Sequence, residues 1–181
     1  MIDELSRRQL RIIGEITDVA AANGVDVWLR GGWAMDFFLG ELTRPHVDVD
    51  WFCWAADADR LASALHDRGF VDDPRVPPEL QRDLVKDGVE VSFALLARDA
   101  RDRVVVGAAG RWAGSPYPEG MLDGPVGRLG DVSCRTICPR SQIELKEMYP
   151  VWMPERPRRA KDRDDITRLK AALVTAPGPA G

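Results

Sequence analysis

The sequence predicts an α+β fold, in which helices pack against a mixed β-sheet and a helical segment follows near the C-terminal end. Apolar residues recur at helical spacing near both ends of the chain, in residues 3–22 and 162–174. Between them, residues 25–30 and 47–54 alternate with a period of two, which is typical of strands. An Asp-Gly pair between two further strand-like segments predicts a β-hairpin in the same sheet.

The N-terminal half is expected to alternate helices and strands. The predicted elements are a helix over 3–22, a strand over 25–30, a helix over 33–39, a strand over 47–54 and a helix over 57–68. Asn23-Gly24 and Gly40 are suited to ending the first two helices, and Asp57 is a suitable N-cap for the third.

The C-terminal half has a weaker pattern after the hairpin. The predicted elements are hairpin strands over 81–85 and 89–96, edge strands over 103–106 and 132–137 within long loops, and helices over 141–149 and 162–174. Ser141 is the expected N-cap of the helix over 141–149, with Glu144 in the capping-box position. Residues 175–181 are expected to form a disordered tail.

Composition limits the classes of protein to consider. A chain of 181 residues with 45% hydrophobic residues fits a single globular domain, and it lacks an apolar segment of the length that a membrane span needs, so we expect a cytoplasmic protein. Cys53, Cys134 and Cys138 are expected to be free thiols rather than zinc ligands. The net charge of −4 disfavours a protein whose whole surface binds nucleic acid.

Two strand carboxylates carry the clearest chemical pattern. Asp48 and Asp50 are two residues apart in a predicted strand, so their side chains point to the same side. Two like charges repel each other unless a cation lies between them. Magnesium is typically held by one or two carboxylates together with substrate phosphates. The pair therefore predicts a magnesium site.

A glycine pair precedes these aspartates at the junction of a strand and a helix. Backbone N–H groups of Gly31 and Gly32 can approach phosphate oxygens because no side chain intervenes. Glu90, on the strand after the Asp-Gly turn, is the best candidate for a third carboxylate, which would share a metal or accept a proton from the acceptor hydroxyl. Asp87 is the next candidate.

Three segments of the chain resemble the minimal nucleotidyltransferases of the DNA polymerase β type, and within them the aminoglycoside 2″-adenylyltransferase-like group. These segments are Gly31-Gly32-Trp33-Ala34-Met35-Asp36, Leu39-Gly40 and Thr43-Arg44-Pro45-His46-Val47-Asp48-Val49-Asp50. The resemblance covers residues 20–100, and a weaker similarity to the same family is found in residues 161–165. It implies a nucleotidyltransferase fold, metal ligands at Asp48 and Asp50, and a third carboxylate. That third residue is usually Asp, whereas Glu90 is one methylene longer. The implied single domain spans 1–174, with a catalytic core over 20–100 and C-terminal helices over 141–174.

Other residues keep two interpretations each. Arg44 either contacts the triphosphate or pairs with Asp36 or Glu41, and His46 is interpreted as a hydrogen-bonded structural residue. The basic cluster Arg156, Arg158, Arg159, Lys161 and Arg163 either is a solvated face or contains a phosphate ligand, for which the resemblance points to Lys161. Trp112 and Tyr117 are candidates for lining an acceptor pocket.

The resemblance implies transfer of a nucleoside monophosphate from a nucleoside triphosphate, with ATP favoured, to a hydroxyl of a small acceptor, assisted by two magnesium ions. An aminoglycoside antibiotic is the favoured acceptor, and Glu119, Asp123 and Asp131 could attract such a polycation. Two alternatives stay open: a toxin-like enzyme that modifies RNA or protein, and a nucleotide-binding relative without turnover.

Overall fold

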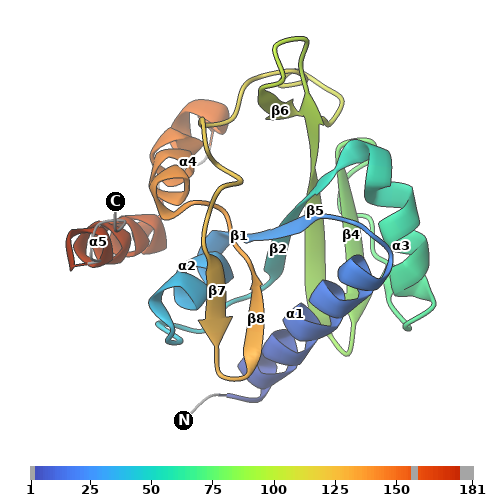
Figure 1. Ribbon diagram of the computed structural model, residues 1–181, viewed down its shortest axis with the longest axis horizontal. Coiled ribbons are helices and arrows are strands. Elements are labelled where there is room, and N and C mark those ends of the chain that lie inside the picture. Colours follow the sequence, from blue (N-terminus) through green and yellow to red (C-terminus); the bar gives the residue numbers. More distant parts are fainter. Residues whose placement is uncertain (1–2, 156–158, 176–181) are drawn as a thin grey trace.

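The computed structural model describes residues 3–155 and 159–175 (Figure 1). The helices are α1 (Glu4–Ala22), α2 (Gly31–Leu39), α3 (Ala58–His66), α4 (Pro139–Trp152) and α5 (Ala160–Thr175), with a 3-10 turn at Ala55–Asp57. The strands are β1 (Val27–Arg30), β2 (Val49–Trp54), β3 (Val71–Asp72), β4 (Gln81–Lys86), β5 (Val89–Arg98), β6 (Val104–Val106), β7 (Val126–Leu129) and β8 (Val132–Arg135). None of the helices in these ranges is long and apolar enough to cross a membrane.

The main sheet is mixed, as predicted. Its strands follow the order β1-β2-β5-β4-β3, and β6 pairs with the far end of β5. Only the β2–β5 pair is parallel among these neighbours, while the other pairs are antiparallel. β7 and β8 form a separate hairpin. The α+β fold class is therefore confirmed.

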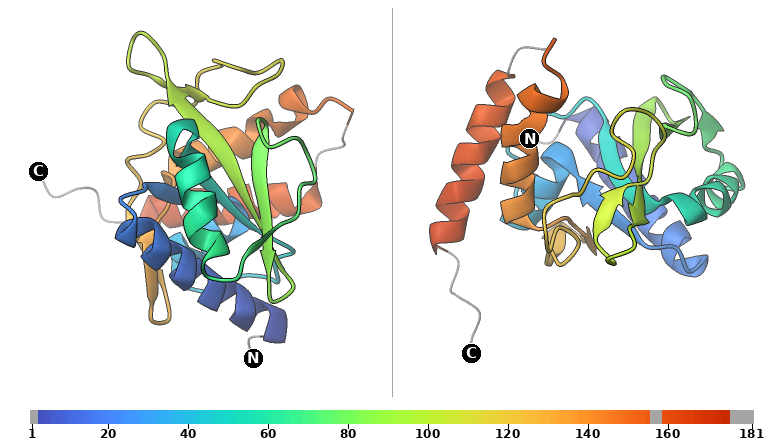
Figure 2. Two further views of the ribbon diagram at one scale, coloured as in Figure 1. Left: turned by 90° about the vertical axis from the view of Figure 1, so that its right-hand side faces the viewer. Right: turned by 90° about the horizontal axis from the view of Figure 1, so that it is seen from above.

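The register of the central strands decides which side chains share a face. Val49 lies opposite Val91 on β5, and Asp50 lies opposite Ser92 on β5 and Arg30 on β1. Because side chains alternate, the apolar residues Val49 and Trp51 belong to the main core, together with residues of α1 and α3. The left view of Figure 2 shows α1 and α3 in front of the sheet and α4 and α5 behind it.

The opposite face of the sheet carries the polar residues and a second, smaller core. Phe52 packs there with Trp28, Leu96, Met121 and Ile137. A third cluster, of Met35, Ile143, Ile166 and Leu169, joins α2 to α4 and α5. The C-terminal helices therefore pack directly on the helix that begins at the glycine pair.

The predicted hairpin is confirmed. Asp87 and Gly88 have φ angles of 51° and 72°, and this left-handed pair is the conformation that two-residue hairpin turns require. Asn23 and Gly40 end α1 and α2 as expected. Asp57 forms no side-chain cap for α3, since it lies in a 3-10 turn and binds Arg60 at 2.5 Å.

Several predicted boundaries were wrong. Helix α4 begins at Pro139 with Cys138 as its N-cap, so Ser141 lies buried inside the helix rather than capping it. Proline is favoured at this first position because an N–H group there has no acceptor within the helix, so proline, which lacks the N–H, loses no hydrogen bond. Helix α2 begins at Gly31, which places both glycines in its first turn. Thr175 belongs to α5 rather than to a tail, and residues 176–181 lie outside the described part of the chain.

Candidate functional site

Two adjoining hollows mark the polar side of the sheet. A small polar one of about 80 Å³, here called the notch, is lined by Gly31, Gly32, Asp48, Asp50 and Lys161 among others. A larger one of about 830 Å³, here called the large cavity, lies beside it. The two share the residues Arg30, Gly31, Asp50, Lys146 and Arg159. The predicted glycine and aspartate residues therefore meet at one end of a cavity of ligand size.

The two aspartates lie at the start of β2, which begins at Val49 rather than at the predicted residue 47, so that only Asp50 belongs to the strand. Asp50 lies in the strand and accepts a hydrogen bond from Ser92 Oγ at 2.6 Å, while Arg30 Nη2 lies 3.7 Å from the same carboxylate oxygen. Asp48 comes just before the strand, and none of the described residues donates a hydrogen bond to its side chain. Burial raises the pKa of Asp48, and the negative charge of Asp50 raises it further, against the lowering effects of Lys161 and Arg75. A cation bound between the carboxylates would relieve this repulsion.

Both glycines are required by close packing. Gly31 has a φ of +73°, a conformation that other residues rarely adopt, and a Cβ there would lie 3.1 Å from Asp50 Oδ2. A Cβ on Gly32 would overlap the imidazole ring of His46 and come within 2.7 Å of Arg44 Nη2. The glycine pair thus permits the close approach of β2 and of the loop before it to the start of α2.

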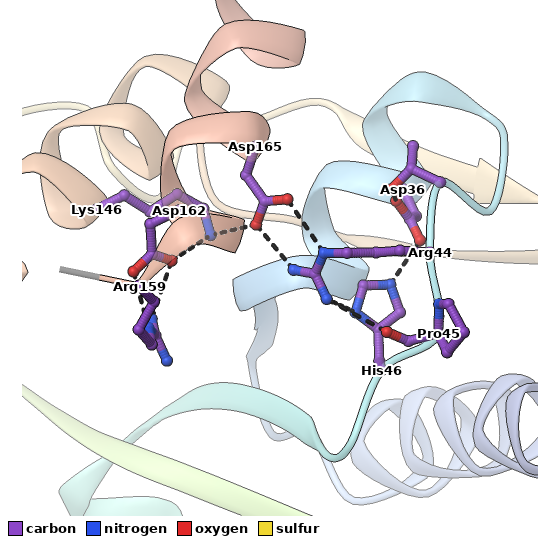
Figure 3. Close-up of polar contacts among 9 residues, drawn as sticks. Asp36, Arg44, Pro45, His46, Lys146, Arg159, Asp162 and Asp165 are labelled. Atoms are coloured by element: carbon purple, nitrogen blue, oxygen red, sulfur yellow. Dashed lines mark hydrogen bonds and ion pairs between the residues drawn. The ribbon is translucent and has the colours of Figure 1, made fainter. Parts of the chain in front are cut away.

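His46 connects this loop to α2. The ring is buried, with Nε2 at 2.6 Å from Asp36 Oδ2 and Nδ1 at 2.9 Å from Arg44 Nη1 (Figure 3). Because a guanidinium group only donates, Nδ1 accepts from Arg44 and Nε2 carries the proton that is donated to Asp36. Thr43 Oγ1 also donates to Asp36, at 2.6 Å. Both ring nitrogens are engaged, which agrees with the structural role predicted for His46.

Five charged residues tie α4 and α5 to the same loop. We call Arg44, Lys146, Arg159, Asp162 and Asp165 the α5 charge network (Figure 3). Asp165 accepts from Arg44 Nε at 3.2 Å, from Arg44 Nη2 at 2.8 Å and from Lys146 Nζ at 2.8 Å. Asp162 binds Arg159 at 2.8 and 3.0 Å and lies 3.6 Å from Lys146. The expected pairing of Arg44 with Asp36 or Glu41 is therefore replaced by a two-point ion pair with Asp165.

The two carboxylates of this network are almost fully buried. Asp162 and Asp165 are each 1% exposed and lie three residues apart, hence on one face of α5. Burial alone would raise the pKa of Asp165, but hydrogen bonds from Arg44 and the charge of Lys146 outweigh it and hold the pKa below 3.8. Asp165 is therefore ionised at neutral pH, and it balances two cations.

Glu90 has a different environment from the one predicted. Val49 of β2 pairs with Val91 of β5, so Glu90 precedes this pair on β5 as Asp48 precedes it on the neighbouring chain segment. The Glu90 carboxylate nevertheless accepts a hydrogen bond from Arg75 Nη1 at 2.7 Å, and Glu90 lines neither hollow. Arg75 also binds the buried Asp83, through Nη2 at 3.1 Å. In the described chain, no three side chains of the His, Cys, Asp or Glu type gather closely enough to hold a metal ion. A role for Glu90 as third ligand stays a prediction, and it requires Glu90 to leave Arg75.

Of the predicted basic cluster, two members lie at the notch. Lys161 lines it and is exposed, and with the residues that the structure describes it forms no hydrogen bond or ion pair. Arg159 lines both hollows, and its guanidinium also lies 4.5 Å from the Tyr149 ring. Arg163 is exposed, and Arg156 and Arg158 lie outside the described residues.

Trp112 and Tyr117 both line the large cavity, and their role in an acceptor pocket stays a prediction. Tyr117 is in edge contact with Phe52, at a centroid distance of 5.2 Å, and with Trp152, at 6.5 Å. The cavity wall is thus built from the sheet, the loop before β7 and most of α4, from Gln142 onward.

Sequence reasoning missed Arg30 and Lys146, which line both hollows. Arg30 directly precedes the glycine pair at the end of β1, and that position was the one available signal. Lys146 is a single lysine in a helix, and only the packing of α4 and α5 brings it to the notch.

Comparisons with known proteins agree with this arrangement. The family model of the aminoglycoside-2''-adenylyltransferases matches residues 12–119. A 2''-aminoglycoside nucleotidyltransferase from Klebsiella pneumoniae is 40% identical over 42 residues, which is 23% of this chain and 24% of that protein. The aligned segment thus spans about a quarter of this relative's length.

Two solved structures share the fold. The solution structure of the antibiotic-resistance factor ANT(2'')-Ia has a TM-score of 0.73 at 17% identity, covering 92% of this chain and 85% of that one. The lincosamide antibiotic adenylyltransferase LnuA, bound to lincomycin, has a TM-score of 0.67 at 18% identity, covering 90% of this chain and 96% of that one. Because the family model matches more than half of the chain, the protein belongs to the aminoglycoside-2''-adenylyltransferase family.

Proposed function

We propose that this protein is a magnesium-dependent nucleotidyltransferase, which moves a nucleoside monophosphate from a nucleoside triphosphate, with ATP favoured, to a hydroxyl of a small acceptor. The observation that carries the proposal is the junction of the two hollows at Asp50. A polar notch with paired carboxylates, glycines and cations opens there onto a cavity of about 830 Å³, which is within the usual range for small-molecule sites. Family membership makes antibiotics the first acceptors to test.

The residues present fit a magnesium ion. Asp48 and Asp50 offer hard oxygen ligands at the start of β2, and the raised pKa of Asp48 reflects its burial and the negative charge of Asp50 beside it. Bound magnesium would supply charge neutralisation at the reacting phosphate and at the departing pyrophosphate. Two ions are expected for this chemistry, and Glu90 would serve the second one after parting from Arg75.

The remaining notch residues would bind and orient the triphosphate. Lys161 has its ammonium group available, and the backbone N–H groups at the start of α2 face no intrahelical acceptor. Lys146 and Arg159 add positive charge where the notch meets the large cavity. Arg44 also lines the notch, but its donors are largely used by Asp165 and His46, so we assign it mainly to holding the loop before β2 in place.

The chemical step would then depend on positioning. Nucleotidyl transfer needs an in-line arrangement of the acceptor hydroxyl, the α-phosphate and the pyrophosphate. Asp50 lines both the notch and the large cavity, so an acceptor in the large cavity and a triphosphate in the notch would meet beside this carboxylate. Glu90 is proposed to accept the hydroxyl proton.

The direct test is incubation with magnesium, labelled ATP and a panel of aminoglycosides and lincosamides. We expect labelled product and release of pyrophosphate, both lost in Asp48→Asn. A melting experiment adds an acceptor-free control, since magnesium and ATP together should stabilise the wild type more than the sum of their separate effects. Additive shifts, or unchanged co-stabilisation in Asp48→Asn, would contradict the shared site.

A further inference from the structure

We infer that the preferred acceptor is an amphipathic hydroxyl compound with an apolar body and a single amine, rather than a polyamine aminoglycoside. This inference rests on the proposed function and specifies its acceptor. It follows from the chemistry of the large cavity.

The charged residues of the cavity are unevenly distributed. Its three cations, Arg30, Lys146 and Arg159, all belong to the end that it shares with the notch. Away from the notch, the described lining residues include no cation and two carboxylates, Glu119 and Glu144, both of them exposed. The end shared with the notch carries these three cations against one carboxylate, Asp50, so it disfavours a polycation, and the rest of the cavity offers few carboxylates to compensate.

The acidic residues expected to attract a polycation do not gather at the cavity. Of Glu119, Asp123 and Asp131, only Glu119 lines it. Asp131 lies in the turn between β7 and β8, on a hairpin that contributes no residue to the cavity wall. The site thus matches one or two positive charges on its ligand, not a larger number.

Most of the remaining wall is apolar and aromatic. Trp112 and Tyr117 come from the loop after β6, and Trp152 comes from the end of α4. Arg111 links these parts, because its guanidinium lies 5.1 Å from the Trp112 ring and its Nη2 donates to the backbone carbonyl of Trp152 at 2.8 Å. Trp112 is 38% exposed, which leaves an aromatic face for a ligand to cover.

The experiment compares two hydroxyl-bearing probes of different charge on the full chain. Lincomycin carries a single basic amine and alkyl groups, whereas tobramycin is a polyamine. Binding is measured by calorimetry with magnesium and a non-cleavable ATP analogue, between about 0.05 and 0.5 M salt. We expect lincomycin to bind about ten-fold more tightly than tobramycin, with little dependence on salt, because burial of apolar surface is not screened by ions.

Variants locate the binding energy. Trp112→Ala should weaken lincomycin binding about ten-fold and Trp112→Phe should retain most of it, since the aromatic face supplies the contact. Val126→Ala is the matched control, because Val126 is a large exposed apolar residue, 67% exposed, that lines neither hollow. Glu119→Gln should weaken binding of the amine several-fold, whereas Asp131→Asn should have no effect.

Each result decides the inference. Tighter binding of tobramycin, or binding of neither probe, overturns it, and so does equal behaviour of Trp112→Ala and Val126→Ala. The proposed function fails on separate grounds. Magnesium-dependent transfer to tobramycin that is lost in Asp48→Asn would leave the proposed function intact while refuting the amphipathic acceptor. Failure of magnesium and ATP to bind together would refute the proposed function itself.

Discussion

Asp165→Asn should destabilise the protein strongly, because it removes the negative charge that joins α5 to the notch. The carboxylate is 1% exposed and accepts three hydrogen bonds from two cations. In the variant, Arg44 and Lys146 would face each other with one neutral amide oxygen between them. Both cations would then keep their desolvation cost without the compensating charge.

The size of the effect follows from the exposure of these cations. Removing one partner of a buried ion pair typically costs about 3–5 kcal/mol. Arg44 is 25% exposed and can regain water, and Lys146 keeps Asp162 at 3.6 Å, so we expect the lower end, about 3 kcal/mol. For a chain of this length, that loss corresponds to a decrease in Tm of roughly 6–12 °C.

Urea denaturation of the wild type and the variant measures this difference, with Asp164→Asn as control. Asp164 is the exposed neighbour on the same helix, and its replacement should change the free energy of unfolding by less than about 0.5 kcal/mol. Binding of magnesium and ATP should weaken in Asp165→Asn only, because Arg44 and Lys146 both line the notch.

The pH dependence provides a second criterion. The pKa of Asp165 is lowered in the folded state, so its stabilising effect is fully present above the ordinary value of 3.8 and is lost as the pH falls through the lower folded value. The difference between the wild type and Asp165→Asn should therefore be constant near neutral pH and decrease below about pH 4. A loss under about 1 kcal/mol at pH 7, or one that matches Asp164→Asn, would refute the reasoning.

Three further predictions concern the candidate site. Asp48→Asn and Asp50→Asn should each abolish transfer in a product assay. Asp48→Asn should also raise the Tm of the metal-free protein, because it removes a negative charge that burial and the neighbouring Asp50 disfavour. Glu90→Gln should retain ATP affinity by calorimetry but lose a factor of about 100 in kcat if it accepts the proton, and equal kcat would move that role elsewhere. Gly32→Ala should lower the free energy of unfolding by about 2 kcal/mol, since its Cβ would overlap the His46 ring, and an unchanged urea midpoint would contradict this.

Local pattern was sufficient for the central fold. The strand that carries Asp50 and the hairpin turn at Asp87-Gly88 follow from period-two alternation and from a turn that needs left-handed residues. The β7 strand was missed because it spans only Val126–Leu129, contains a glycine and leaves Val126 67% exposed, so it carries little apolar pattern. The start of α4 was misplaced because Ser141 looked like a cap, while Pro139 fixes the first turn two residues earlier.

The candidate site was predictable only for residues that lie close to one another in the sequence. Asp48 and Asp50 lie near each other in the chain and beside the glycine pair, and the structure places all four at the notch. The partner of Arg44 was not predictable, since Asp165 is 121 residues away and nearer carboxylates were available in the sequence. Such a pair depends on the docking of α5 against α2, where Met35, Ile143, Ile166 and Leu169 form an apolar cluster.

The glycine pair also shows why its sequence context carries more information than the glycines alone. Gly32 lacks room for a side chain because His46 lies against it, and His46 is held there by Asp36 on α2 and by Arg44. Arg44 in turn is held by Asp165. The glycine segment, the loop before β2 and the start of α5 are therefore one packed unit, although they are far apart in the sequence. A substitution in any of the three should disturb the others, and the two C-terminal helices belong to the site as much as the strands that carry its aspartates.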